Sequence, residues 1–383
     1  MANETSSSEP RAASTKEEWN EFAYMGPGTL AGRYMRLFWH PVYVSDDLPI
    51  GRPKPIRILG EDFTLYRGES GAAHVVDFRC AHRGTQLSIG WVEGDDVRCR
   101  YHGWKYGPDG QCTEQPGEPE PFCEKVRIKS YPTQEYLGFV FAYLGEGTPP
   151  TFRRYPAFER DGVRLVTHWE RGYNYFNAAE NDAIHVFFTH HRTHGSWRDM
   201  QLPRIEAEET PSGLATIRVW PDGRRTQTRT LMPNMSYRKA RNSNAGRGNN
   251  LSWKVPIDDH HFSQFNLEWF PFGEKAERYV QRRKEFAKDQ TFVDELVAKV
   301  FSGELHLDDI PVEGADVHTI NQVEDGSTQR GQGVIADRTA ERLGRTDAPV
   351  ILLRRIWQRE LRALAEGRPL KQWELPEDDE AAD

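Results

Sequence analysis

The chain has 383 residues, of which 37% are hydrophobic, so it is long enough for two globular domains with sizeable cores. No apolar run approaches the roughly 20 residues that a membrane-spanning helix needs, and the N-terminus lacks the apolar stretch of a secretory signal. The net charge of −8 comes from the two ends, and the near-neutral remainder has no basic face that would favour nucleic acid.

The two ends of the chain are predicted to be solvated tails. Residues 1–18 are rich in Ser, Glu and Ala, which is typical of a disordered segment, and residues 374–383 form an acidic tail. Residues 19–38 predict a short helical lead-in with the turn "MGPGT" and the amphipathic run "LAGRYMRLFW". Four cysteines in a long chain without a secretory signal argue against a disulfide framework and predict a cytoplasmic protein.

Short alternating runs from about residue 40 predict a small antiparallel β domain. Examples are "PIRILG", "AHVVDF" and "LGFVFAYLG", in a region cut by Gly, Pro and Asp. A Gly- and Pro-rich linker at residues 145–156 ends this pattern. We therefore place the first domain, including its lead-in, at residues 19–152 and the second at residues 153–373, and we expect the two to have separate hydrophobic cores.

The second domain mixes strands with helices, which predicts an α+β fold. Its strand-like runs are "GLATIRVW", "NLSWKVPI" and "FSQFNLEWF". The segment "WERGYNYFNAAENDAIHVFFTHH" predicts a helix because no Pro or Gly follows Gly172 within it. The segment "DAPVILLRRIWQRELRALAEG" predicts an amphipathic helix that ends at Gly367.

A metal site is indicated by two motifs, Cys80-x-His82 and Cys99-x2-His102. Structural zinc and iron–sulfur clusters of all-Cys or mixed type can all use ligands of these kinds. A Cys2His2 zinc finger keeps its cysteines together, whereas here each motif carries one thiol and one imidazole. This order favours a [2Fe–2S] cluster in which both thiolates bind one iron and both imidazoles bind the other.

The residues around these motifs suit such a cluster. Three glycines allow tight loops, and two aromatic residues can shield the cluster from water: Gly84, Gly103, Gly107, Tyr101 and Trp104. Cys112 and Cys123 lie outside the pattern and are expected to be ordinary thiols.

A second metal site is indicated by Asp182-x2-His185-x4-His190. On a helix, Asp182 and His185 share a face, while His190 lies about one and a half turns beyond His185. The two histidines therefore leave a common stripe unless the helix ends or distorts, which is more typical of a metal site than of packing. Two histidines and one carboxylate would leave positions on Fe(II) open for O2 and substrate. The alternative is an ordinary local cluster of histidines, since His191 and His194 lie close by.

The segments "CAHRG" and "CRYHGWKY" resemble the Rieske signature, C-x-H-R-G followed by C-x-Y-H-G-W. Over about residues 25–360 the chain is similar to the phthalate dioxygenase branch of the Rieske non-heme iron oxygenases. This resemblance implies an antiparallel β Rieske domain with a [2Fe–2S] cluster held by Cys80, His82, Cys99 and His102. It also implies a helix-grip-like α+β catalytic domain with a mononuclear Fe(II).

The resemblance further implies which residues bind that iron. His185 and His190 match the iron histidines, and Asp325 in "NQVEDGSTQRG" lines up with the carboxylate ligand that precedes a glycine-rich turn. Glu324 stands where the branch often has Gln and is the second candidate for the carboxylate ligand. Asp316 is the third candidate.

In this family an acid would bridge the two metal centres, and the match assigns this role to Asp182, between His102 and His185. The electron would pass between neighbouring subunits of a homotrimer or a dimer of trimers. A separate NAD(P)H-dependent reductase with flavin and ferredoxin-type centres would supply it, since no such motif occurs in the sequence. O2 and a small aromatic, carboxylated substrate would then react by hydroxylation, cis-dihydroxylation or O-demethylation. The alternative function is that of a Rieske electron-transfer protein without its own oxygenase chemistry.

Candidate substrate contacts come from strands of the second domain. They are Asn234, Met232 and Trp253. Three cationic residues either receive a substrate carboxylate or are ordinary surface charge: Arg238, Arg241 and Lys254.

Overall fold

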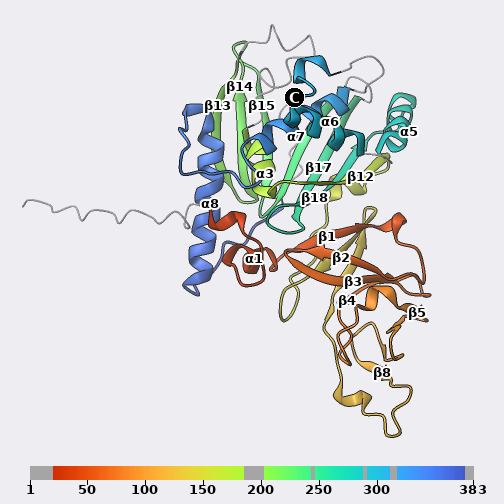
Figure 1. Ribbon diagram of the computed structural model, residues 1–383. Helices are drawn as coiled ribbons and strands as arrows, with labels where there is room; N and C mark the ends of the chain where they lie inside the picture. Colours follow the sequence, from red (N-terminus) through yellow and green to blue (C-terminus); the bar gives the residue numbers. More distant parts are fainter. Residues whose placement is uncertain (1–19, 185–201, 243–245, 288–290, 311–316, 376–383) are drawn as a thin grey trace, which may run out of the picture.

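The computed structural model describes residues 20–184, 202–242, 246–287, 291–310 and 317–375. Figure 1 shows a β-rich first domain at the lower end and, above it, a large sheet with helices packed on it. No helix within the described ranges is long and apolar enough to cross a bilayer. The cytoplasmic location stays a prediction.

The first domain consists of three small antiparallel sheets, as its alternating runs predicted. They are β1-β11-β10 (Trp39–Val44, Phe139–Tyr143, Thr133–Tyr136), β2-β3-β4-β9 (Lys54–Ile58, Glu61–Arg67, Ala73–Asp77, Ser130–Tyr131) and β5-β6-β7-β8 (Trp91–Glu93, Asp96–Arg98, Lys105–Tyr106, Cys112–Glu114). The last of these sheets lies at the end of the domain farthest from the large sheet (Figure 1).

The second domain is built on a seven-stranded antiparallel sheet in the order β12-β18-β17-β16-β15-β14-β13, which agrees with the predicted α+β class. Its strands are β12 Val163–Arg171, β13 Arg204–Thr210, β14 Gly213–Val219, β15 Arg225–Leu231, β16 Met235–Asn242, β17 Gly246–Pro256 and β18 Phe262–Phe270. Its helices are α2 Pro156–Glu159, α3 Tyr175–Ile184, α5 Glu274–Ala287, α6 Thr291–Ser302, α7 Val317–Gly331 and α8 Ala348–Ala365. Helices α3, α6 and α7 lie over one face of the sheet, and α8 runs along its β13 edge (Figure 1).

Most predicted elements of the second domain are confirmed, and two differ. The three strand-like runs form β14, β17 and β18, and α8 ends just before Gly367, whose φ of +64° suits a glycine at a helix C-terminus. The helix predicted earlier in the chain begins only at Tyr175, since residues 169–171 belong to β12 and residues 172–174 connect the strand to the helix. The segment predicted as a glycine-rich turn is helix α7. Gly326 is accommodated in it because it faces α6, where an added Cβ would come within 3.2 Å of Val297 Cγ2.

The helical lead-in packs on the second domain, although the sequence analysis assigned it to the first. Its elements are η1 Glu21–Ala23 and α1 Leu30–Met35. Phe22 stacks on Phe176 of α3 with ring centroids 4.1 Å apart, and Tyr34 meets the edge of Trp357 in α8 at 5.3 Å. These buried aromatic contacts explain the placement, because the apolar side of a helix this short must be covered by a neighbouring element.

The two domains share one hydrophobic core, which corrects the expectation of separate cores. Phe139 and Phe141 of β11 both pack against Trp253 of β17, with ring centroids 5.8 Å apart in each pair. A second core belongs to the outer end of the first domain alone and includes Cys80 and Cys99. The loops with the Cys/His motifs thus fold around their own small core, while the base of the first domain is fused to the second.

Candidate metal centres and active site

The two Cys/His motifs form a matched pair of loops. Each loop starts at its cysteine and turns at the glycine four residues later, which is Gly84 or Gly103. The glycine amide donates to the cysteine carbonyl at 2.9 and 3.0 Å, and the cysteine amide donates to the carbonyl five residues on at 2.8 Å in both loops. The φ angles of Gly84 and Gly103, +76° and +77°, lie in the left-handed region, where glycine is favoured. The sequence therefore sets the same backbone turn behind both cysteines.

The four predicted cluster ligands come together at these loops. The thiols of Cys80 and Cys99 are buried, and the rings of His82 and His102 have centroids 4.6 Å apart. Nδ1 of His82 is buried and has no hydrogen-bond partner in the described part of the chain. A buried nitrogen without a partner is costly unless it binds a metal. This donor set therefore fits a [2Fe–2S] cluster with two sulfur and two nitrogen ligands.

Aromatic rings enclose the two imidazoles. The ring of His82 stacks on Trp104, with centroids 4.5 Å apart and planes within 8°. Tyr101 lies against His102 at 3.8 Å and is itself 57% exposed. The histidine side of the site thus stays close to the surface, where another protein can reach it.

Tyr106 also belongs to this site and was not among the residues predicted from the sequence. Its hydroxyl lies 3.1 Å from Cys80 Sγ and accepts a hydrogen bond from the Ala81 amide at 3.1 Å. Burial raises the pKa of Tyr106 above its ordinary value, so the hydroxyl keeps its proton and can donate a hydrogen bond to Cys80 Sγ when that sulfur is a metal-bound thiolate. Its signal in the sequence was its place in the run "HGWKY". Cys112 and Cys123 are free thiols in the same end of the domain, and burial raises the pKa of Cys112 to about 12.

The second predicted metal site is described only in part. His185, His190 and Asp316 lie outside the described residues, and α3 is described up to Ile184. Asp325 lies on α7, where its Oδ1 accepts a hydrogen bond from Asn181 Nδ2 at 3.3 Å. The fold therefore brings the predicted carboxylate ligand to the last described turn of α3, at Asn181, which precedes His185 by four residues in the sequence.

Asp182 is held in a buried ion pair that the sequence analysis did not foresee. Its Oδ2 accepts a hydrogen bond from Lys254 Nζ, and its Oδ1 lies 3.6 Å from Arg238 Nη2. Burial alone would raise the pKa of Asp182, but Lys254 and Arg238 outweigh it and hold the pKa below its ordinary value. The side chain of Lys254 is 4% exposed, so this residue is not ordinary surface charge.

Side chains alternate along β16 and β17 and give the large sheet two different faces. Arg238 and Lys254 reach Asp182 of α3, and the same face includes Ser252. The intervening residue Trp253 points the other way, into the core shared with the first domain. A polar face thus lies under α3, and an aromatic face lies on the first domain.

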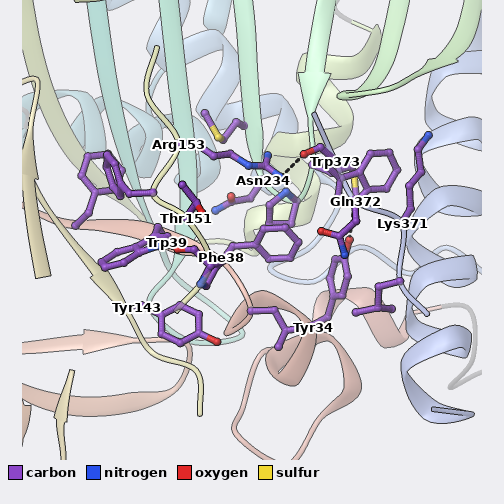
Figure 2. Close-up of a pocket in the computed structure, with 18 of the residues that line it drawn as sticks. Tyr34, Phe38, Trp39, Tyr143, Thr151, Arg153, Asn234, Lys371, Gln372 and Trp373 are labelled. Carbon is purple, nitrogen blue, oxygen red and sulfur yellow. Dashed lines mark hydrogen bonds between the residues drawn. The ribbon is translucent and has the colours of Figure 1, made fainter. Parts of the chain in front are cut away.

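The three predicted substrate residues do not lie with Asp182 and Asp325. Trp253 packs in the shared core, as described above. Met232 and Asn234 line a cavity of about 310 Å³ between the lead-in, the interdomain linker and the C-terminal segment, which Figure 2 shows. The residues lining this cavity include none from α3 or α7. A role of these three residues in substrate binding stays a prediction that their placement does not support.

Comparison with known proteins adds to this geometry. Residues 38–132 match the family described as the Rieske [2Fe-2S] domain. The phenoxybenzoate dioxygenase subunit alpha of Ectopseudomonas oleovorans is 30% identical over 91% of this chain and 85% of its own length. The 5,5'-dehydrodivanillate O-demethylase oxygenase subunit of Sphingobium sp. is 29% identical over 93% of this chain and 82% of its own length. The terminal oxygenase of carbazole 1,9a-dioxygenase from Novosphingobium sp. KA1 has the same fold, with a TM-score of 0.62 and 19% identity. The match covers 91% of this chain and 97% of that structure.

The chain therefore belongs to the oxygenase subunits of the Rieske non-heme iron oxygenases. It is an oxidoreductase with a [2Fe–2S] cluster and a mononuclear iron. The similarity extends through the second domain, which favours an oxygenase component over a protein that only transfers electrons. The fold, the class of enzyme and the two cofactors that the sequence predicted are thus confirmed.

Proposed function

We propose that the protein oxygenates a small aromatic carboxylate at an iron held by His185, His190 and Asp325. The observation that carries this proposal is the contact between Asp325 and Asn181, which brings a carboxylate from α7 to the end of α3. When bound, the iron supplies the activation of O2 and the cluster supplies single electrons. The protein itself orients the substrate, excludes water and holds the charged groups around the two centres.

The charge on the polar face under α3 supports a carboxylated substrate. Lys254 and Arg238 lie next to Asp182. Arg218 lies near Arg238, and burial, together with Arg238, lowers the pKa of Arg218 to about 10. A bound iron would add two further positive charges next to this face. An anion placed there would relieve the repulsion among these cations. Arg238 is the suitable anchor, because it is 34% exposed and no hydrogen bond fixes it to Asp182.

A panel of aromatic acids and methoxyaromatics, assayed by O2 uptake and product mass, tests the substrate class. The Arg238→Met variant should raise KM for a responsive acid about ten- to hundredfold, the range for loss of a charge-assisted hydrogen bond. The KM for the primary amide of the same acid should not change. Arg225→Met is the control, since this exposed arginine pairs with Glu206 at the surface. Equal losses for acid and amide would contradict a carboxylate contact.

The positions of the two centres within one chain support transfer of electrons between subunits. The loops with Cys80 and Cys99 lie at the outer end of the first domain, whereas α3 lies in the second domain, on the large sheet (Figure 1). A cyclic homotrimer, or a dimer of trimers, would place the cluster of one subunit beside the iron of the next. Asp182 would then link His102 of one subunit to His185 of its neighbour.

A separate protein must reduce the cluster. The carbazole 1,9a-dioxygenase structures include complexes of the oxygenase with its ferredoxin. For this chain we propose an NAD(P)H-dependent reductase with flavin and ferredoxin-type centres as the electron donor.

A further inference from the structure

Lys254 is a buried cation on β17 whose ammonium group lies against Asp182 on α3. Removing a lysine from water carries a large desolvation penalty, and an ion pair repays it only in part. Two apolar side chains of similar size would make this contact at least as stable. Stability alone therefore does not explain why a lysine stands at this position.

The contacts of Asp182 show what Lys254 does. Lys254 binds Oδ2 only. Arg238 Nη2 lies 3.6 Å from Oδ1, which is beyond hydrogen-bond distance, so Oδ1 can still accept a hydrogen from an imidazole. Lys254 thus fixes one oxygen of the carboxylate and leaves the other available.

The helix that carries Asp182 is tied to the same sheet. The Thr216 hydroxyl of β14 donates to the carbonyl of Ala183, in the last described turn of α3. Backbone and side chain are therefore held from two strands, β14 and β17. The direction of the Asp182 carboxylate is set by these two contacts.

We propose that Lys254 is a positioning residue for electron transfer between the cluster and the iron, because it holds Asp182 in the orientation that links the two centres. The inference rests on the proposed role of Asp182. Without Lys254, Arg238 is the cation that remains next to the carboxylate, and it would draw the carboxylate away from that orientation. Lys254 itself needs no contact with either metal centre.

The test measures single-turnover reoxidation of the pre-reduced cluster in Lys254→Met, Asp182→Asn and the double variant, all as complete oxygenase. Lys254→Met should slow reoxidation about ten- to hundredfold, the range for loss of a charge-assisted hydrogen bond. The double variant should be no slower than Asp182→Asn alone, because the lysine acts only through the aspartate. Lys254→Arg should restore part of the rate. Additive effects of the two single changes would overturn the inference.

A second readout does not depend on the iron. The midpoint potential of the cluster is measured after chelation of the mononuclear iron. Asp182→Asn and Lys254→Met should both raise it, since each takes a carboxylate away from His102. A lower potential in Lys254→Met would show that the lysine acts by its charge alone, and would refute a positioning role.

Arg338→Met is the matched control. Arg338 is a buried cation that pairs with Glu180, also on α3, at 2.8 Å. This variant should lower stability, while its reoxidation rate should stay within about twofold of wild type, because Arg354 still pairs with Glu180 and holds α3, and because Glu180 faces away from Asp182. A wild-type rate in Asp182→Asn would refute the proposed role of Asp182 itself. A wild-type rate in Lys254→Met, with Asp182→Asn slow, would refute only the inference about Lys254.

Discussion

Asp325 is the single side chain on which the assignment of the iron site depends most. The Asp325→Ala variant should lose the mononuclear iron and keep the cluster, because an Fe(II) site with one carboxylate binds weakly without it. Iron should fall from about three to about two atoms per chain, with the spectrum of the reduced cluster unchanged. Glu324→Ala is the paired control, since this neighbour is 1% exposed and is the second candidate. Loss of iron in Glu324→Ala but not in Asp325→Ala would reverse the assignment.

The sequence could predict which Cys and His residues come together at the proposed cluster site, but it could not predict the side chains that contact the functional groups. Cys80 and His82 lie two residues apart in one short loop, so a local sequence motif contains both of them. The contact between Tyr106 and Cys80 joins residues 26 positions apart, and that between Asp182 and Lys254 joins residues 72 positions apart. Only the folded structure brings these groups together, because residues so far apart in the sequence form no local motif.

Helix α3 depends on a buried charge network for its position. Glu180 accepts hydrogen bonds from Arg338 and Arg354, and both arginines are almost fully buried. Glu180→Ala should lower the free energy of unfolding by about 3–5 kcal/mol, because two buried cations lose their shared partner. Denaturant unfolding measures the loss.

The control for this change is an ion pair at the surface. Glu274→Ala removes an exposed i,i+4 pair with Arg278 on α5 and should cost under about 0.5 kcal/mol. If both substitutions cost the same, the network around Glu180 would have no special role in holding α3.

Elements whose hydrophobic residues recur with a clear helical or strand period were predicted well, and elements defined by tertiary packing were not. Helix α8 and strands β14, β17 and β18 have runs long enough to show their period. Helix α7 contains Gly326, which argues against a helix until its contact with Val297 of α6 is known. The contact of the lead-in with the second domain was not predicted, because nothing in its own sequence shows that Phe22 stacks on Phe176.

The arrangement of the whole chain separates the two metal centres while joining the two domains. The shared core of Phe139, Phe141 and Trp253 fuses the base of the first domain to the second. The loops with the cluster ligands project beyond this fused base, at the far end of the first domain (Figure 1). The loops with the Cys/His motifs and helix α3 lie in different domains of the chain, which supports our proposal that a neighbouring subunit completes the path.

Mixed trimers test this path directly. The His102→Ala variant lacks a working cluster and His185→Ala lacks a working iron site, so each alone should be inactive. Random assembly of equal amounts into a ring makes about three quarters of the trimers mixed, and every mixed trimer has one junction where an intact cluster faces an intact iron site. Activity should therefore recover to about a quarter of wild type. If the electron stayed within one chain, no trimer would contain an intact pair, and activity near zero in mixed trimers verified by mass would exclude transfer between subunits.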